Sequence, residues 1–550
     1  MTTPAHADRS QYLEAVRHFA DQVLEHGRDR YGDTHTPLFV DGIQVDTHEP
    51  ATWRYRGQTW VLSNFANQQN LLRTLVGLSN LTGDERYRDA AVAATRHMFE
   101  HQRHACGLLY WGGHQIVDLL TNENRGLDAD CHEFKNTFPF YPFLWEVEPA
   151  GTRAFINAFW NAHVMDWCTL DFNRHGAYGK PLGPMWDREP CRDVEPFFES
   201  EGLTFINAGT DLIYAAATLQ QLDGDAQALA WSKRLARRYV NARHPDTGLG
   251  VYQYSKPRRR ETPPAEGPLT GELTLSRYGD RAENQFGEQY GPVAREGWAL
   301  FGQRATWLYV ANGLVQMYVA ERLGDEGADL LQWTVDGLKA YHRYAYDAAG
   351  NCFRPMWADG TDLTGHTIQR TGYMGPAGTS FQANPADGAF LLVYARAYRL
   401  SRDAQLWEAV RSIGAGLGLG ELGSQPGQAV HLNMNTAVAD DRVIFALLEL
   451  ARATPSGDLC LALAERVADN LLAAHLHKGF FLPSPQHLYA QFDTSQSLAL
   501  LALDATRRGR PDLVPTYIGS RGYTHGLHDG YDRRINDTHI IWAQTRNESE

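Results

Sequence analysis

The 550-residue sequence lacks the marks of several protein classes. No stretch reaches the roughly 18–20 uncharged apolar residues that a membrane-spanning helix needs. The opening residues, MTTPAHADRSQYLE, show no basic segment followed by an apolar one, which is the pattern of a secretory signal. We therefore expect a soluble protein that is not exported.

Cysteine and lysine are both scarce. The chain has six cysteines, and no two of them form a CxxC pair. Scattered cysteines in a chain of this length predict reduced thiols, and with the missing signal they favour a cytoplasmic protein. Only six of the 51 basic residues are lysines, so arginine is expected to carry most of the positive charge.

The charge balance is acidic. With 51 basic and 65 acidic residues, the formal net charge is −14, which opposes binding to nucleic acid or to an anionic membrane. A local cluster of arginines could still attract an anionic small substrate. The composition is 43% hydrophobic, which is enough for a large core and excludes a mainly disordered or fibrous protein.

A repeated helical hairpin is the strongest internal pattern. Each copy has an amphipathic helix, a short turn with Gly or Asp, a second helix and an aromatic-rich extended segment. Apolar residues recur at helical spacing, as at Leu71, Leu75 and Leu78. The turns lie at 82–84, 223–225, 324–325, 401–403 and 456–458, and extended segments lie at 107–111, 248–253, 350–356 and 479–483.

Hairpins of this kind cannot bury their apolar faces singly, so they must close into a ring or stack as a solenoid. Irregular spacing and long insertions, at 176–200 and 255–297, favour the ring. The sequence therefore predicts one all-α toroid of five to seven hairpins over residues 1–550, with short strands and long loops. The aromatic segments are expected to line one end of the ring, where a binding cleft would form.

Histidines and carboxylates gather between residues 107 and 179. His114, His132, His163 and His175 all lie there, and two glycines before His114 permit close backbone approach. His114, Glu133 and His175 together would form a mixed imidazole and carboxylate site, which suits Mn, Co, Ni or Zn better than Ca. A histidine in an aromatic-rich helical protein is also often a hydrogen-bonded core residue. No HExxH, EF-hand, GxSxG or P-loop pattern decides between these readings.

Eight segments in order carry a resemblance to a known family. They are VLSNFANQQNLLRTLVGLSNLTG (61–83), LLYWGGHQIVDL (108–119), HEFKN (132–136), FWNAHVMDW (159–167), RHGAYG (174–179), GLTFINAGTDLIYAAA (202–217), RYGDRAENQFG (277–287) and GLGELGS (418–424). The sequence thereby resembles polysaccharide lyase family two, the pectate lyases built on an (α/α)7 barrel. The matches extend over roughly residues 20–525.

The resemblance implies a metal site and a substrate-binding surface. The family's two metal-binding histidines and its glutamate match His114, His175 and Glu133, with Mn favoured and Co or Ni possible. Residues within the matching segments are expected to bind substrate: Trp111, Lys135, Asn136, Tyr178 and Asn207.

The resemblance also implies two catalytic arginines. Arg174 matches the family's proposed base, and Arg281 matches a second catalytic arginine. Near Arg281 the sequence departs from the family pattern, because Glu283 and Asn284 stand where Gln and Arg are expected. Each arginine could instead hold a structural carboxylate, as Arg281 could pair with Asp280.

The implied reaction is β-elimination. A base removes the C5 proton of a uronate, the bond to O4 breaks, and a 4,5-unsaturated product forms. Cations must neutralise the carboxylate so that this proton becomes acidic. A guanidinium has a pKa above about 12, so Arg174 as base needs added positive charge nearby or a water relay. Nearby histidines or tyrosines are alternative bases.

We therefore predict a metal-dependent lyase of polygalacturonate or oligogalacturonates, cytoplasmic and exo-acting on short oligomers. Two alternatives stay open. One is a toroid glycoside hydrolase of uronate oligosaccharides, which would use two carboxylates and no metal. The other is a non-catalytic oligouronate-binding protein. No nucleic-acid or membrane partner is expected, and the sequence leaves the oligomeric state open.

Overall fold

The chain divides into two compact units, and each is described by itself. The computed structural model describes residues 10–55, 57–126, 131–189, 191, 200, 202–254, 281–520, 522–528 and 531–546. The first unit comprises Met1–His132, Thr137–Phe155 and Gly418–Glu550, and the second comprises Glu133–Asn136 and Ile156–Leu417. That residues 1–550 form a single barrel domain stays a prediction.

The first unit has helices from both ends of the chain. They are α1 (Gln11–His26), α2 (Gln69–Thr82), α3 (Glu85–His101), α4 (Tyr141–Val147), α14 (Asp441–Ala451), α15 (Gly457–His475), α16 (Ser495–Arg507) and α17 (Asp537–Ile540), with 3-10 turns η1 (Phe65–Gln68) and η7 (Pro511–Leu513). Its strands are β1 (Gly42–Gln44), β2 (Thr52–Tyr55), β3 (Gln58–Ser63), β4 (Gln115–Asp118), β5 (Glu123–Gly126), β15 (Gly420–Glu421), β16 (His431–Leu432), β17 (Leu476–His477), β18 (Phe480–Phe481), β19 (Tyr489–Gln491), β20 (His525–His528) and β21 (Tyr531–Asn536).

The hairpin of α2 and α3 shows how the local sequence sets the turn. Gly83 ends α2 in the left-handed region, with φ of 71°, where glycine costs least. Asp84 then caps α3, because its carboxylate accepts the Arg86 N–H at 3.2 Å. Strands β2, β3, β4 and β5 form an antiparallel sheet in this order. Its buried face includes Trp53 and Trp60, which belong to one apolar cluster with Trp542.

Contacts between distant parts of the sequence complete the first unit. Strand β1 pairs antiparallel with β19, with Gly42 opposite Gln491. Helix α16 packs against both α1 and α2. At the start of α2, the Asn70 N–H donates to Asp493 at 2.6 Å. The N-terminal and C-terminal segments are therefore interdependent parts of one core.

The second unit has an equally helical composition. Its helices are α6 (Ile206–Asp223), α7 (Ala226–Asn241), α8 (Arg281–Tyr290), α9 (Gln303–Ala305), α10 (Asn312–Leu323), α11 (Ala328–Ala345), α12 (Gly388–Ser401) and α13 (Ala404–Gly416), with short helical turns η3 (Gly291–Val293), η4 (Glu296–Trp298), η5 (Thr306–Ala311) and η6 (Gly324–Gly327). Its strands are β7 (Val164–Asp166), β8 (Asp171–Phe172), β9 (His175–Ala177), β10 (Ala299–Leu300), β11 (Tyr346–Asp347), β12 (Cys352–Phe353), β13 (Met356–Trp357) and β14 (Asn384–Pro385). Helix α5 (Pro149–His163) and strand β6 (Cys131–Glu133) contain residues of both units.

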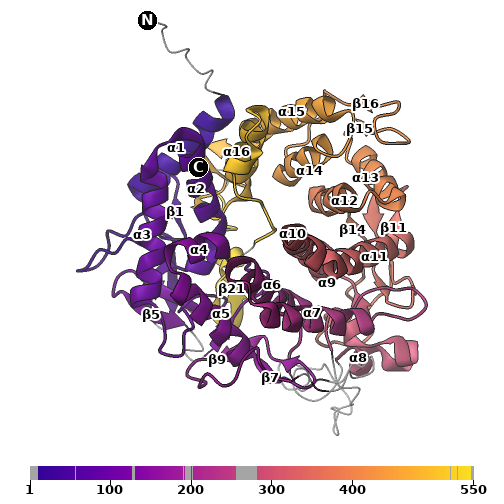
Figure 1. Ribbon diagram of the computed structural model, residues 1–550, viewed down its shortest axis with the longest axis horizontal. Helices are drawn as coiled ribbons and strands as arrows, with labels where there is room; N and C mark the ends of the chain where they lie inside the picture. Colours follow the sequence, from indigo (N-terminus) through magenta and orange to yellow (C-terminus); the bar gives the residue numbers. More distant parts are fainter. Residues whose placement is uncertain are drawn as a thin grey trace, which may run out of the picture. The chain divides into compact units, whose positions relative to one another are not determined.

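Helical hairpins organise the second unit, as Figure 1 shows for α6 with α7, α10 with α11 and α12 with α13. Helix α10 also contacts α6 and α12, so neighbouring hairpins share a core. Gly224 ends α6 in the left-handed region, and Arg402 takes the same conformation after α12. The predicted all-α class, built from helical hairpins with short strands and long loops, is confirmed. None of the described helices has the length and apolar character needed to cross a membrane.

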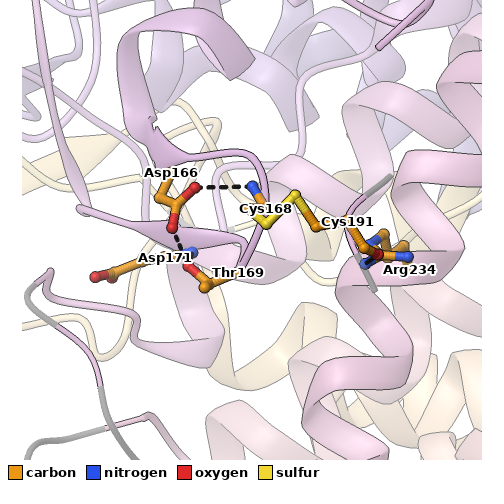
Figure 2. The surroundings of a disulfide bond; sticks show 6 residues. All are labelled: Asp166, Cys168, Thr169, Asp171, Cys191 and Arg234. Atoms are coloured by element: carbon orange, nitrogen blue, oxygen red, sulfur yellow. Dashed lines mark hydrogen bonds between the residues drawn. A yellow bond between two sulfur atoms is a disulfide. The ribbon is translucent and has the colours of Figure 1, made fainter. Parts of the chain in front are cut away.

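A disulfide between Cys168 and Cys191 closes a loop of the second unit (Figure 2). The Cα atoms are 4.8 Å apart. Asp166 fixes one side, since its carboxylate accepts the Cys168 N–H at 2.8 Å. Arg234 of α7 fixes the other side by donating to the Cys191 carbonyl at 2.6 Å. The prediction that all six cysteines are reduced is therefore wrong for this pair, because the loop brings together two thiols that lie 23 positions apart.

Replacing both Cys168 and Cys191 with serine should lower the free energy of unfolding by about 3 kcal/mol, because the cross-link removes entropy from the unfolded chain. Urea unfolding with and without reductant measures this loss. Reductant should bring the wild type to the stability of the double variant and leave that variant unchanged. A wild type whose urea midpoint does not respond to reductant would contradict the cross-link.

Two fully buried carboxyl groups stand out in the first unit. Asp41 accepts the Asn64 N–H at 2.7 Å, and Asp537 accepts the Trp542 indole N–H at 3.1 Å. Burial raises the pKa of Asp41 to about 6 and that of Asp537 to about 7. Both groups are therefore more readily protonated in the folded protein than in the unfolded chain.

Asp537 should make stability depend on pH. A carboxyl group whose pKa is raised on folding contributes stability below its unfolded pKa of about 4, and this contribution is lost as the pH rises through its folded pKa. Between pH 4 and pH 8 the wild type should lose roughly 2–4 kcal/mol relative to Asp537→Asn, by proton linkage. Melting curves across this range test the difference. The exposed Asp89→Asn variant should track the wild type at every pH, and parallel profiles for Asp537→Asn would contradict the assignment.

Candidate active site

Glu133 is the centre of a charged cluster in the second unit. Its carboxylate is buried, and its Oε1 lies 2.8 Å from Lys135 Nζ. The same oxygen lies 3.1 Å from His175 Nε2 and 3.3 Å from Arg174 Nε. One acceptor atom thus faces three cationic or potentially cationic groups. The structure brings together four residues that the sequence selected from two separate motifs.

Arg174 directly precedes strand β9, and His175 begins it. The Arg174 N–H donates to the Leu203 carbonyl at 3.1 Å, and the His175 N–H donates to Asn173 Oδ1 at 2.9 Å. Gly176 follows, and a Cβ there would lie 2.5 Å from the His163 ring. The RHG motif therefore needs glycine so that the strand can pass over that ring.

His163 is a core residue. Its Nδ1 lies 2.8 Å from the Asn173 carbonyl, and burial lowers the pKa of His163 to about 3. The imidazole is therefore neutral at ordinary pH and supports the segment before β9. His163, one of the histidines that the sequence grouped together, thus has a structural role.

Arg281, at the start of α8, is buried and ion-paired. Its Nε donates to Glu296 Oε2 at 2.6 Å, and its Nη2 contacts the other oxygen of the same carboxylate. Nη2 also donates to Gln253 Oε1 at 3.3 Å. The partner of Arg281 in η4 is thus Glu296, whereas Asp280 lies outside the described residues. Burial lowers the pKa of Arg281 to about 10, so its guanidinium stays charged near neutral pH.

Three guanidinium groups, those of Arg174, Arg281 and Arg304, form what we call the arginine cluster. Arg174 and Arg281 both lie over the Phe205 ring, with Cζ 5.1 and 5.4 Å from its centroid. Phe205 stacks on Tyr252 at 5.4 Å between centroids, and Arg304 lies 5.5 Å from the Tyr252 centroid. Cation–π contacts therefore hold several positive charges close together.

Arg304 is the member of the arginine cluster that sequence reasoning missed. Its Nη2 contacts Met374 Sδ at 3.1 Å, and its Nε is buried with no hydrogen-bond partner among the described residues. A positive charge of this kind is suited to an anionic group of a substrate. The FGQRATW segment gave no signal, because it holds a single arginine and matches no recognised motif.

The first unit contains His114. The residue is 2% exposed, and its ring stacks on that of His525, with centroids 5.2 Å apart. The His525 N–H donates to the Gly113 carbonyl at 2.6 Å. Nitrogen and sulfur ligand atoms of His114 and Cys131 lie within 4.8 Å of each other. The sequence analysis did not predict His525 as a site residue, because its GYTHG segment lies outside the motifs shared with the family.

The residues expected to bind substrate have mostly buried positions. Trp111 is completely buried and packs against Phe65 and Phe155 in the first unit. In the second unit, the Asn136 N–H donates to the Asn207 carbonyl at 3.1 Å, and both residues are buried. Trp111, Asn136 and Asn207 thus have packing or hydrogen-bonding roles, and a substrate role for them stays a prediction. A substrate-binding role also stays a prediction for Lys135, which forms an ion pair with Glu133, and for the half-buried Tyr178.

Comparison with known proteins identifies the family of the chain. Residues 36–527 match a family described as periplasmic pectate lyase. The pectate disaccharide-lyase of Dickeya dadantii (strain 3937) is 37% identical over 546 residues, which cover 97% of this chain and 96% of that protein. The chain belongs to this pectate lyase family. The resemblance predicted from the eight segments is confirmed.

The prediction of a cytoplasmic protein is wrong. The pectate lyase family to which the chain belongs is described as periplasmic. The Cys168–Cys191 disulfide is consistent with an oxidising compartment. The absence of an evident signal was a poor guide to location, and the exo-acting prediction that depended on it needs other support.

Solved structures with similar folds are distant from this pectate lyase. A D-mannose isomerase is 10% identical, with a TM-score of 0.43, over 76% of this chain and 88% of that one. A GH76 α-mannanase of Bacteroides thetaiotaomicron is 10% identical, with a TM-score of 0.41, over 92% of this chain and 97% of that one. At these values the similarities imply nothing about substrate or reaction.

Proposed function

We propose that the protein is a metal-dependent pectate lyase that cleaves galacturonate chains by β-elimination and releases unsaturated disaccharides. The observation that carries this proposal is the convergence of Lys135, Arg174 and His175 on the buried Glu133 carboxylate in a member of this family. The name of the Dickeya relative, a disaccharide-lyase, supports release of two-sugar units from a chain end.

The donor groups fit a transition metal. A carboxylate oxygen and an imidazole nitrogen 3.1 Å apart, as in Glu133 and His175, are ligands that Mn, Co or Ni accepts. The proposed ligand set is Glu133, His175 and, from the family motif WGGH, His114. A bound divalent ion would supply Lewis-acid stabilisation of the charge on a uronate carboxylate.

The protein's own cations have a related task in this proposal. Removal of the C5 proton places negative charge on the adjacent carboxylate, and Arg174, Arg281 and Arg304 are the groups proposed to stabilise it. The pair with Glu296 fixes the Arg281 guanidinium, so it need not reorganise during the reaction. Arg304, with its buried Nε unpartnered among the described residues, is suited to hold the substrate carboxylate.

Metal-stripped protein incubated with trigalacturonate or hexagalacturonate tests the proposal. Mn, Co, Ni, Zn or Ca is added singly, and ultraviolet absorbance and chromatography identify the products. An unsaturated disaccharide should form first, and chelator should abolish it. Failure to form any unsaturated product with any ion would remove the lyase proposal. A hydrolase would instead form saturated products and tolerate chelator.

A further inference from the structure

One buried side chain, that of Asn64, connects three separate parts of the first unit. Asn64 is completely buried and lies between strand β3 and the turn η1. It belongs to segment 61–83, the first of the eight segments that carry the family resemblance. This segment contains none of the residues assigned to the active site above. The contacts of Asn64 indicate what it contributes to the site.

The Asn64 carboxamide uses its full hydrogen-bonding capacity. Its Oδ1 accepts the Ala66 N–H and the Gly112 N–H, both at 3.2 Å. Its Nδ2 donates to the Gly112 carbonyl at 2.7 Å and to Thr524 Oγ1 at 3.2 Å. A carboxamide has two donor hydrogens and two acceptor lone pairs, so all four are engaged. A side chain bonded in this way has one orientation.

The surroundings of Asn64 are polar and equally buried. Asp41 Oδ1 accepts the Asn64 N–H at 2.7 Å and a Gln68 amide N–H at 3.1 Å. The Asn67 amide donates to Asp41 Oδ2 and to Thr524 Oγ1, both at 3.4 Å. All five residues are buried. Movement of Asn64 would leave several of these polar groups without partners away from water, which is costly.

The Gly112 peptide is the part of the WGGH motif that Asn64 binds. One side chain thus holds both the N–H and the carbonyl of Gly112, whose φ of 112° favours glycine. The next carbonyl, that of Gly113, accepts the His525 N–H at 2.6 Å. His114 follows directly and precedes strand β4. The backbone that leads to His114 is therefore fixed by Asn64 from one segment and by His525 from another.

His114 needs such support if it binds a metal. It belongs to the proposed ligand set, and one residue separates it from Gly112. A displacement of the Gly112 peptide therefore moves the His114 backbone and, with it, the imidazole. Residues that orient a metal ligand without touching the metal typically change metal affinity by about 10- to 100-fold when they are replaced.

We propose that Asn64 is a positioning residue for the metal ligand His114. It holds the Gly112 peptide so that the imidazole is presented to a divalent ion. Asp41 and Thr524 fix Asn64 in turn, so residues near both ends of the chain contribute to this support. The inference rests on the proposed function, because His114 enters the ligand set there.

The test is titration calorimetry of full-length, metal-stripped Asn64→Ala with Mn. The dissociation constant should rise about 10- to 100-fold, because the Gly112 peptide loses both of its bonds to the carboxamide while His114 itself is unchanged. An Mn affinity equal to that of the wild type would overturn the proposal.

Gln69→Ala is the matched control. Gln69 is a second completely buried carboxamide of the first unit. It accepts the Phe140 N–H at 2.8 Å and donates to the Phe65 carbonyl at 2.7 Å, and these bonds do not involve the WGGH motif. Both changes should lower the melting temperature, since each leaves buried polar groups unpaired. Only Asn64→Ala should bind Mn more weakly, and an equal loss of affinity in Gln69→Ala would overturn the proposal.

Thr524→Val gives a second variant if Asn64→Ala does not fold. Valine keeps the shape of threonine and removes only the hydroxyl that accepts the Asn64 amide. The dissociation constant for Mn should rise roughly three- to tenfold, the scale of one neutral hydrogen bond. An unchanged Mn affinity of Thr524→Val would then overturn the proposal.

Activity at increasing Mn concentration gives a further readout. If Asn64 acts through His114, excess Mn should restore turnover in Asn64→Ala, with half-maximal activity at about 10- to 100-fold more Mn than the wild type needs. A loss that Mn does not restore would assign Asn64 a structural role instead. A wild type that binds Mn but forms no unsaturated product would refute the lyase proposal, and the Mn affinities would still test Asn64. A wild type that does not bind Mn would refute both the metal site and this inference.

Discussion

Glu133→Gln should lower kcat on oligogalacturonates by roughly 100- to 1000-fold, the scale seen when a key electrostatic group is removed from an active centre. Glutamine keeps the shape of the side chain but removes its negative charge. Lys135, Arg174 and His175 then face a neutral amide, whose nitrogen cannot accept their hydrogen bonds. The cluster loses both its counter-charge and its proposed metal ligand.

Two readouts distinguish these losses. Steady-state kinetics measures kcat and KM, and titration calorimetry with Mn measures the affinity of the metal-stripped protein. Glu288→Gln, an exposed position in α8, is the matched control and should match the wild type in both. Full activity of Glu133→Gln would show that the charged cluster is structural. Lost activity with unchanged Mn affinity would remove Glu133 from the proposed ligand set.

Glu296→Ala should destabilise the protein by about 3–5 kcal/mol, which is the cost of leaving a buried charge without its partner. Arg281 is 4% exposed, and its pKa of about 10 keeps it charged at neutral pH. Its bond to Gln253 Oε1 at 3.3 Å cannot replace a carboxylate that receives two of its N–H groups. The unpaired charge should therefore destabilise mainly the start of α8 and the η4 turn.

Urea unfolding of four proteins resolves the energetics of this pair. Replacing both partners, as Arg281→Met with Glu296→Leu, should recover most of the stability, because no unpaired charge remains. Glu408→Ala breaks the exposed pair of Glu408 and Arg411 and should cost less than about 1 kcal/mol. Equal losses of stability for Glu296→Ala and Glu408→Ala would show that burial does not make the Arg281–Glu296 pair more important for stability than an exposed pair.

The helical hairpins could be predicted from sequence because local signals decide them. Gly83 and Gly224 occupy left-handed positions at helix ends, and apolar spacing marks the buried faces. Arg402 also adopts the left-handed conformation at the end of α12, although it is not a glycine, so nothing in the sequence indicated it. There, packing of α12 against α13 overrides the local preference of the residue.

The charged cluster around Glu133 could be predicted only in part. Motifs identified Glu133, Arg174 and His175, because their spacing is shared with a family. The partner of Arg281 could not be read from spacing, since Glu296 lies 15 positions away and reaches it only through the fold. Arg304 was missed for a similar reason, because it lies in no recognisable motif and only tertiary contacts bring it beside Tyr252 and Phe301.

The order of the two units along the chain has a consequence for biosynthesis. Almost all of the second unit is one continuous stretch, Ile156–Leu417, so it can fold while translation continues. Helices α1 and α2 pack against α16, and strand β1 pairs with β19, so these N-terminal elements cannot complete their packing until the C-terminal elements have been made. Until α16 and β19 have been made and have reached it, the N-terminal segment exposes an apolar surface that a chaperone could shield.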